Sequence, residues 1–128
     1  MKYNALVKAI DSNIEEEVRV EINGIEFTGF VDCFPYLINT GSYYPVEIGI
    51  TVLDDLELKE INESVQEIEQ IGNGFGYFIR GELDGNCCLN SVMIFQDDWF
   101  LEYSYLGGKY VEIMVDRISI EFLEEELN

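Results

Sequence analysis

Apolar and polar residues alternate over most of the segment from Val18 to Asp32, and this is the clearest pattern along the chain. The alternation is interrupted by Asn23-Gly24, a dipeptide that favours a two-residue β-turn because both positions need positive φ. A hairpin with this turn pairs Ile22 with Ile25, Val20 with Phe27 and Val18 with Gly29. All of these apolar side chains then lie on one face, as a half-buried hairpin requires. The other face is acidic and places Glu21 directly opposite Glu26.

Six other segments have the alternation or the short apolar runs that are typical of strands. They are residues 3–10, 44–53, 75–83, 87–95, 99–106 and 110–122. Asp84-Gly85 and Gly107-Gly108 predict tight turns, and the first turn would place Cys88 opposite Gly81. The apolar phase slips around Asp116-Arg117, which predicts a bulge or bend of the kind that helps small barrels to close.

One segment has the three- and four-residue spacing of an amphipathic helix. Its apolar residues are Leu58, Ile61, Val65, Ile68 and Ile71. Asp54 and Glu57 match a capping box at its start, and Gly72 supplies a stop at its end. We therefore predict a helix over residues 55–71. The alternative is that Asp54-Asp55 form a turn between two strands.

These elements predict a β-rich protein: an antiparallel sheet or small OB-like barrel of about seven or eight strands with one helix at residues 55–71. The OB-like assignment is an analogy of element order, because the helix falls between the third and fourth main strands. The alternative is an α+β fold in which the helix packs on an open antiparallel sheet. We expect residues 1–123 to form a single domain, followed by an acidic tail at residues 124–128.

Charge limits the partners that such a domain can bind. The chain of 128 residues has 26 acidic and seven basic residues, a formal net charge of −19, and no histidine. Nucleic-acid binding needs Lys and Arg to neutralise phosphate, so neither nucleic acid nor an anionic membrane is an expected partner. The missing histidine removes the commonest general base and metal ligand. The charge favours a basic partner.

The expected location is cytoplasmic. No stretch of the sequence is long and apolar enough for a membrane span, and the first residues lack the basic and apolar regions of a signal peptide. The three cysteines are an odd number and include the adjacent pair Cys87-Cys88, unlike the spaced, even set of a secreted scaffold.

The motifs that invite a catalytic or cofactor-binding interpretation have simpler explanations. The glycine-rich run 72–76 follows the predicted helix, whereas a phosphate-binding loop precedes one. Cys87 and Cys88 would point to opposite faces of a strand, so they would not share a metal. The pairs Asp54-Asp55 and Asp97-Asp98 lack the ligand spacing of a calcium loop. We predict no catalytic residue, no cofactor and no metal, and we do not expect an enzyme.

The aromatic residues are more informative. In a strand over Trp99–Tyr105, the odd positions would form one aromatic face, made of Trp99, Leu101, Tyr103 and Tyr105. Such a face is either part of the core or, if exposed, a protein-binding surface, because Tyr and Trp anchor interfaces. The sequence leaves both interpretations open.

Our leading hypothesis is a small acidic binding protein that recognises a basic protein, in the manner of a toxin-neutralising immunity protein or an inhibitor. The predicted partner-binding residues are Glu17, Glu21, Glu26 and Asp32 on the hairpin, together with Tyr43, Tyr44, Asp97, Asp98 and Trp99. One alternative is an oligomer subunit or a barrel that holds a small ligand in a pocket lined by Tyr77, Ile79, Val92 and Tyr103. A carboxylate-dependent enzyme is a third.

Overall fold

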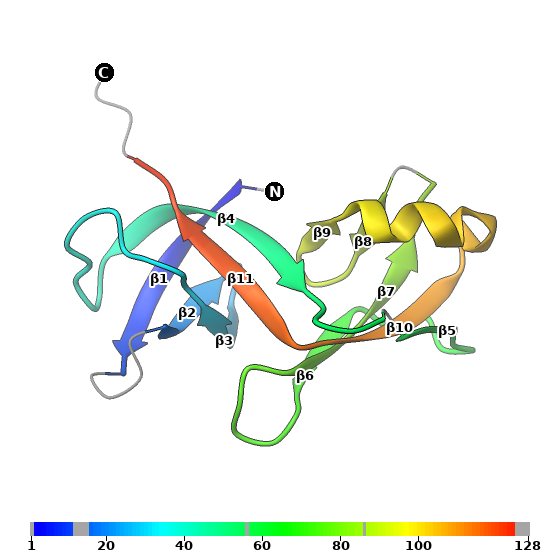
Figure 1. Ribbon diagram of the computed structural model, residues 1–128, viewed down its shortest axis with the longest axis horizontal. Coiled ribbons are helices and arrows are strands. Elements are labelled where there is room, and N and C mark those ends of the chain that lie inside the picture. The colour runs from blue at the N-terminus through cyan, green and yellow to red at the C-terminus, as the bar shows by residue number, and fades with distance from the viewer. Residues whose placement is uncertain (1, 12–15, 56, 86, 125–128) are drawn as a thin grey trace.

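The computed structural model describes residues 2–11, 16–55, 57–85 and 87–124, which form a closed five-stranded barrel and a second, six-stranded sheet (Figure 1). The barrel has the order β1-β2-β3-β11-β4. Its strands are β1 (Lys2–Ile10), β2 (Glu17–Ile22), β3 (Ile25–Phe30), β4 (Tyr43–Thr51) and β11 (Arg117–Phe122). The fold is therefore β-rich with a barrel, as predicted.

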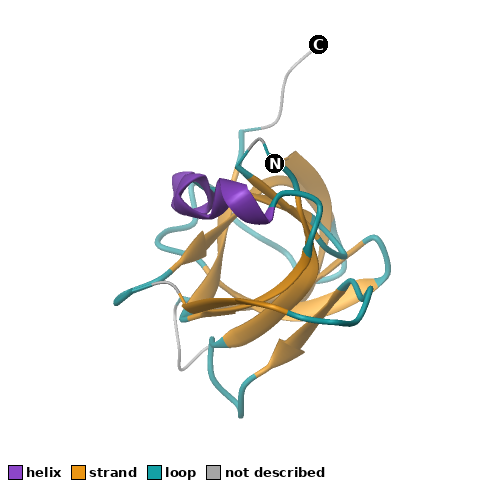
Figure 2. Ribbon diagram, turned by 90° about the vertical axis from the view of Figure 1, so that its right-hand side faces the viewer, coloured by secondary structure: helices purple, strands orange, loops and turns teal. Residues whose placement is uncertain are grey.

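The second sheet has the order β5-β10-β7-β8-β9, and β6 also pairs with β7. Its strands are β5 (Glu57–Glu60), β6 (Glu67–Gln70), β7 (Tyr77–Leu83), β8 (Cys88–Asn90), β9 (Ile94–Gln96) and β10 (Tyr110–Val115). A 3-10 helix, η1 (Asp98–Leu106), lies between β9 and β10 in the chain and outside the ring of strands (Figure 2). The described residues thus form more strands than the sequence predicted.

The hairpin of β2 and β3 has the predicted register. Asn23 and Gly24 both have positive φ. The paired residues include Ile22 and Ile25, Val20 and Phe27, Val18 and Gly29, and Glu21 and Glu26. Val18, Val20, Ile22 and Phe27 are buried, so the alternation predicts both the pairing and the face that enters the core.

The barrel closes where β3 meets β11. These strands are parallel, with Ser119 opposite Phe30, while β4 is antiparallel to both β11 and β1. An added Cβ at Gly29 would clash with the side chain of Ile120, so the absence of a side chain lets β3 approach β11 closely.

The second sheet is an insertion between β4 and β11 of the barrel. The chain returns at Asp116, where β10 of the second sheet gives way to β11 of the barrel (Figure 1). The Asp116 carboxylate accepts a hydrogen bond of 2.6 Å from the backbone amide of Leu53, on the outgoing segment. The bend predicted around Asp116-Arg117 is therefore confirmed.

The helix predicted over residues 55–71 is wrong. Among the described residues of this segment, 57–60 and 67–70 form β5 and β6, and residue 56 lies outside the described residues. Leu58 pairs with Ile113, and Ile68 pairs with Ile79, so apolar residues of two separate strands pack on the core. Their spacing imitates a helix because each strand contributes one such position.

The strand predicted over residues 99–106 is also wrong, because this segment is η1. The side chain of Asp97 accepts a hydrogen bond of 2.9 Å from the amide of Trp99 and caps the helix. Helices with three residues per turn place every third side chain on one side. Phe100, Tyr103 and Leu106 accordingly pack against the core.

The predicted two-residue turn at Asp84-Gly85 is replaced by a longer connection. β7 and β8 pair Leu83 with Leu89, so Cys88 does not lie opposite Gly81 as predicted. Cys87 has a φ of 64° and precedes β8, so it is not a strand residue. Gly107-Gly108 joins η1 to β10, rather than two strands.

One hydrophobic cluster extends through both sheets. It includes Phe27 and Val46 of the barrel and Ile79 and Ile113 of the second sheet. Two buried or half-buried tyrosines tie the sheets together through their hydroxyl groups, which accept hydrogen bonds from backbone amides. Tyr77 accepts from Thr28 at 2.8 Å, and Tyr3 accepts from Ile94 at 2.9 Å.

Candidate functional site

The outer face of the β2–β3 hairpin carries mixed charges. Glu21 and Glu26 lie opposite each other, as predicted. Each also has a cation within 4 Å: Lys8 Nζ is 3.7 Å from Glu21 Oε2, and Arg19 Nε is 3.6 Å from Glu26 Oε1. Arg19 also donates a 2.8 Å hydrogen bond to the Thr28 hydroxyl. The intramolecular ion pairs therefore reduce the negative potential of this face.

The other two acidic residues predicted on the hairpin lie at its ends. Glu17 starts β2 and is hydrogen-bonded to Asp11; burial, that hydrogen bond and repulsion by Asp11 raise the pKa of Glu17 above its ordinary 4.5. Asp32 is exposed just after β3. Arg19, opposite Thr28, lies between Glu17 and Glu21 on β2 and 3.6 Å from Glu26, so a cation interrupts the acidic residues of this face.

The two predicted tyrosines have opposite environments. Tyr43 is 66% exposed, whereas Tyr44 is only 7% exposed. The Tyr44 hydroxyl accepts a 2.8 Å hydrogen bond from the Asn39 amide, and its ring packs edge-on against Phe122. Tyr44 is therefore a core residue that cannot anchor a partner without unfolding, and its assignment to the binding surface is corrected.

A second acidic surface lies at the junction of the barrel and the second sheet. A cleft of about 480 Å³ opens between the outer side of β4 and β11 and the segment that leads into η1. Its acidic lining residues are Glu47, Asp97, Asp98 and Glu121. Gly49 and Ser119, which face each other across β4 and β11, also line it. Of the described residues that line this cleft, none is basic.

Strand register explains how this charge accumulates. Glu47 and Glu121 are directly opposite each other on β4 and β11, an arrangement that costs stability because like charges are adjacent. Lys2 on β1 is the register partner of Glu47 on its other side and offsets part of that cost. Asp97 and Asp98 then approach from the opposite wall with no basic residue between them in the lining.

The sequence predicted half of this acidic set. Asp97 and Asp98 were singled out as partner-binding residues, and the structure brings them together with Glu47 and Glu121, which were not. Both glutamates occupy outward positions beside buried Val46 and Ile120, so alternation alone marks them as exposed. What the sequence does not show is that β4 and β11 are neighbours, because the whole second sheet separates them in the chain.

The aromatic segment next to the cleft is largely exposed. Trp99 is 36%, Leu101 56% and Tyr105 76% exposed, whereas Phe100 is buried. Tyr103 is half-buried and its ring lies 6.4 Å from that of Tyr105. The predicted aromatic face on one side of a strand is wrong, but Trp99 does lie at the surface, beside Asp97 and Asp98.

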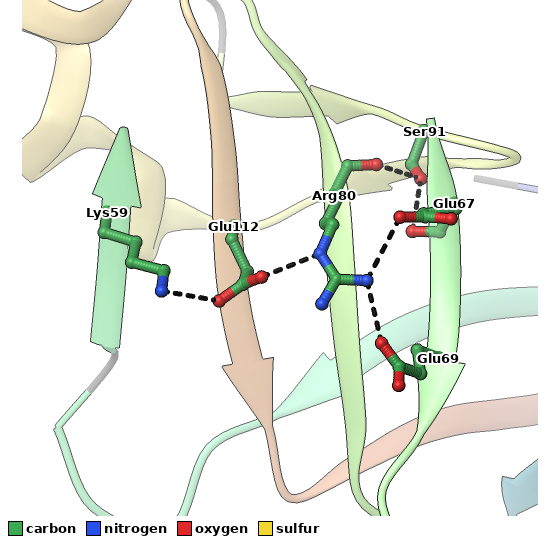
Figure 3. Close-up of polar contacts among 6 residues, drawn as sticks. All are labelled: Lys59, Glu67, Glu69, Arg80, Ser91 and Glu112. Atoms are coloured by element: carbon green, nitrogen blue, oxygen red, sulfur yellow. Dashed lines mark hydrogen bonds and ion pairs between the residues drawn. The ribbon is translucent and has the colours of Figure 1, made fainter. Parts of the chain in front are cut away.

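The tightest charge network lies elsewhere, on the outer side of the second sheet (Figure 3). Arg80 Nε donates to Glu112 Oε2 at 2.7 Å, and Arg80 Nη1 contacts Glu67 at 3.2 Å and Glu69 at 3.0 Å. Lys59 Nζ is 3.2 Å from the other oxygen of Glu112. Burial raises the pKa of Glu112, but the hydrogen bonds from Arg80 and Lys59 outweigh it, so the pKa lies below its ordinary 4.5. Strong mutual pairing gives this network a structural role.

Two of the residues predicted to line a ligand pocket, Tyr77 and Ile79, lie inside the core. The described part of the chain contains no group of three or more Cys, Asp or Glu residues arranged to hold a metal ion. None of its helices is long and apolar enough to cross a membrane.

The fold and the surface define the molecule as a β-rich protein with a closed barrel, an inserted sheet and an open acidic cleft at their junction. By comparison with known families, the chain belongs to the family described as uncharacterised conserved protein UCP019853, which matches residues 1–123. Neither a curated protein nor a solved structure matches the chain.

Proposed function

We propose that this protein is a small acidic binding protein that recognises a basic protein by charge complementarity. In its narrower form, the proposal is that it neutralises a basic toxin or enzyme, as an immunity protein or an inhibitor does. Such a role needs a rigid scaffold and a surface of the right charge, rather than catalytic residues. We also interpret the barrel as OB-like, with the second sheet inserted between its fourth and fifth strands.

The supporting observation is how the few basic residues are used. Lys8, Arg19, Lys59 and Arg80 all form ion pairs with glutamates of the same chain. The guanidinium of Arg117 lies 3.9 Å above the centre of the Phe30 ring. Five of the seven basic residues therefore already have an anionic or aromatic partner, while 26 acidic residues are present. The chain therefore has far more carboxylates than cations of its own to balance them.

The acidic cleft at the junction of the two sheets, called the junction cleft below, is the best candidate for the contact with a basic partner. Its described lining residues include four carboxylates and no basic residue. The outer face of strands 2 and 3, which OB-type barrels commonly use for ligands, instead carries the Lys8–Glu21 and Arg19–Glu26 pairs. Opposite charge on the two partners would speed association and exclude anionic competitors such as nucleic acid.

The proposal is tested with labelled oligo-arginine and oligo-lysine peptides, with oligo-glutamate and single-stranded DNA as controls. Fluorescence anisotropy should show binding of both basic peptides that weakens steeply as salt screens the charges, and no binding of the two anionic probes. Binding of DNA, or no binding of either basic peptide at low salt, would contradict the proposal. Affinity capture from the native organism, followed by elution with salt, should then enrich basic proteins.

The narrower role has its own test. A basic enzyme recovered in that eluate should lose activity when stoichiometric amounts of this protein are added back at low salt, and should regain it at high salt. If a captured enzyme stays fully active, the protein binds it without inhibiting it, and the inhibitor role is wrong.

A further inference from the structure

The outward sides of η1 carry large apolar residues that are partly or largely exposed. Phe100, Tyr103 and Leu106 face the core, as a spacing of three residues favours, and η1 is kinked at Tyr103, whose φ of −112° and ψ of 20° are not helical; the other residues lie in two outward rows. One outward row begins with Trp99 and ends with Tyr105, and the other contains Asp98 and Leu101. Trp99, Leu101 and Tyr105 are 36%, 56% and 76% exposed. Aromatic residues in this position are enriched where proteins bind other proteins.

This apolar helix face adjoins the acidic cleft. Asp98 belongs to both, since it lines the cleft and lies in the same row of η1 as Leu101. Glu102 adds a further exposed carboxylate between Trp99 and Tyr105. A single short segment of another protein could therefore contact the apolar helix face and the cleft together.

The strand surface below the cleft includes a glycine, so no side chain fills the space above it. Gly49 lies near the end of β4, and its φ lies outside the positive region, so other residues could adopt its backbone conformation. An added Cβ there would meet no atom within 4 Å. Glycine weakens a strand, and it is often found where a ligand or another chain approaches the backbone. Gly49 lines the same cleft as the Glu47–Glu121 pair and as Asp97 and Asp98.

We propose that η1 and the junction cleft form one docking surface for a segment of a basic partner, with an apolar side chain on Trp99, Leu101 and Tyr105 and an arginine or lysine in the cleft above Gly49. This inference rests on the proposed function and names the partner's chemistry: a basic segment in which apolar and cationic residues alternate. Charge complementarity selects this occupant, because the cleft is lined by four carboxylates, Asp98 among them, and the helix face adds a fifth, Glu102, beside its apolar residues.

Three short labelled peptides test the chemistry of the partner. One alternates arginine with leucine, the second arginine with serine, and the third glutamate with leucine. The surface predicts that the arginine–leucine peptide binds tightest, that the arginine–serine peptide binds about tenfold more weakly because the helix face stays empty, and that the glutamate–leucine peptide does not bind. Trp99 is the only tryptophan, so its emission should shift to the blue when the first peptide covers it.

Two variants test the location. Gly49→Gln places a neutral side chain in the cleft and should weaken binding of the arginine–leucine peptide about tenfold, with little change in stability. Its matched control is Gly74→Gln, at another glycine with open space and an ordinary φ, in the β6–β7 turn. Leu101→Ser should weaken binding of the same peptide severalfold, and its control is Leu37→Ser, at an exposed leucine of a loop outside η1.

The outcomes separate this inference from the proposed function. If basic peptides bind but Gly49→Gln and Leu101→Ser behave like their controls, the docking surface is elsewhere and the inference is wrong, while the proposed function stands. Equal binding of the arginine–leucine and glutamate–leucine peptides would show that the surface recognises apolar residues without regard to charge, and this result would also overturn the inference. A dimer in sedimentation experiments that Leu101→Ser dissociates would show a second copy of the chain as the occupant. Failure of every basic peptide would overturn both proposals.

Discussion

The barrel and the second sheet are both β structures, but they reach their pairing by different routes. The barrel strands have six to nine residues, and β2 and β3 are joined by the tight Asn23-Gly24 turn. The second sheet includes strands of three or four residues, and β5 pairs with β10 across most of the inserted segment. Local turn chemistry therefore specifies the β2–β3 pair, whereas β5–β10 of the second sheet and the β4–β11 pair that completes the barrel depend on contacts between distant parts of the chain.

The barrel and the second sheet also differ in the geometry and exposure of their ion pairs. The ion pairs of the barrel hairpin are long and partly exposed, at 3.6–3.7 Å. In the second sheet, Arg80 and Glu112 approach to 2.7 Å, and their side chains are only 19% and 14% exposed. A less solvated pair with good geometry is stronger than an exposed one. The Arg80 network joins β5, β10, β7 and β6 side by side, where no tight turn sets the register (Figure 3).

The largest expected effect tests whether residues 98–106 are helical. Phe100→Ala should lower the free energy of unfolding by about 4 kcal/mol, because Phe100 is buried in the shared core. Trp99→Ala should cost about 1 kcal/mol, since Trp99 is partly exposed. Urea denaturation followed by circular dichroism measures both, because the second variant lacks the only tryptophan. The reverse order of effects would support the strand that the sequence predicted.

This pair of residues shows why the sequence was informative for one half of the fold. Period-two alternation around a turn dipeptide has one simple solution, so the β2–β3 register followed directly. Residues 99–106 fit a period of two and a period of three equally well, and only packing of Phe100 on the core selects the second. Leu58 and Ile68 imitate a helix because their strands are too short to show their own alternation.

The candidate site was predictable to a similar extent. The exposure of Asp98 could be inferred from residue type, whereas for Trp99 the sequence leaves core and surface both open. The convergence of Asp98 with Glu47 and Glu121 depends on β4 and β11 lying side by side, which no local pattern encodes. Tyr44 was misassigned because a tyrosine beside a loop can equally well use its hydroxyl to satisfy a buried backbone amide.

A second test compares two glycines at close backbone approaches. An added Cβ at Gly81 would clash with the carbonyl of Asn90 and lie 3.1 Å from Ser91 Cα, so only a backbone shift can accommodate it. We expect Gly81→Ala to cost about 3 kcal/mol. Gly29→Ala meets only the side chain of Ile120, which can move, and should cost about half as much.

A rescue experiment sharpens this contrast. Ile120→Val removes the Cδ1 atom that an alanine at position 29 would strike, so it should recover part of the stability lost in Gly29→Ala. No side-chain substitution should rescue Gly81→Ala, because its clash is with backbone. Chemical denaturation measures the free energy of unfolding of the three single variants and of the Gly29→Ala/Ile120→Val double variant. Gly74→Ala, in open space, serves as the control. Equal losses at Gly29 and Gly81 would remove the proposed difference between the barrel and the second sheet.

The third test compares the two arginines. Arg80→Met should lower the free energy of unfolding by about 2 kcal/mol, between the values typical of exposed and buried ion pairs, because Glu112 would keep only Lys59. Arg19→Met should cost less than about 1 kcal/mol, because its ion pair with Glu26 is partly exposed and long. Measurements at low and high salt should show the larger salt dependence for the Arg19 pair. A cost at Arg19 equal to that at Arg80 would mean that both sheets rely on charge equally.

The smallest effect is expected in the pH dependence of stability. One carboxyl of the second sheet and one of the barrel should change the free energy of unfolding in opposite directions as the pH falls. The pKa of Glu112 lies below its ordinary 4.5, so the folded state binds fewer protons there than the unfolded state, and this stabilisation is lost as the pH falls through that range. Glu112→Gln should therefore be destabilising at neutral pH, with a difference from wild type that shrinks on acidification.

Glu17 should show the opposite behaviour, because burial and its hydrogen bond with Asp11 raise its pKa. The stability that this carboxyl contributes is present at low pH and is lost as the pH rises through its folded pKa. Glu17→Gln keeps a neutral hydrogen-bonding group and should be slightly stabilising at neutral pH, an advantage that disappears in acid. Urea titrations at neutral and acidic pH measure the free energy of unfolding of each variant and of the wild type. Each variant removes one negative charge from a chain of net charge −19, so comparing the two variants cancels the general relief of repulsion. If both variants shifted stability in the same direction at neutral pH, the barrel carboxyl at position 17 would be an ion-pair partner like Glu112, and the electrostatic contrast between the two sheets would be wrong.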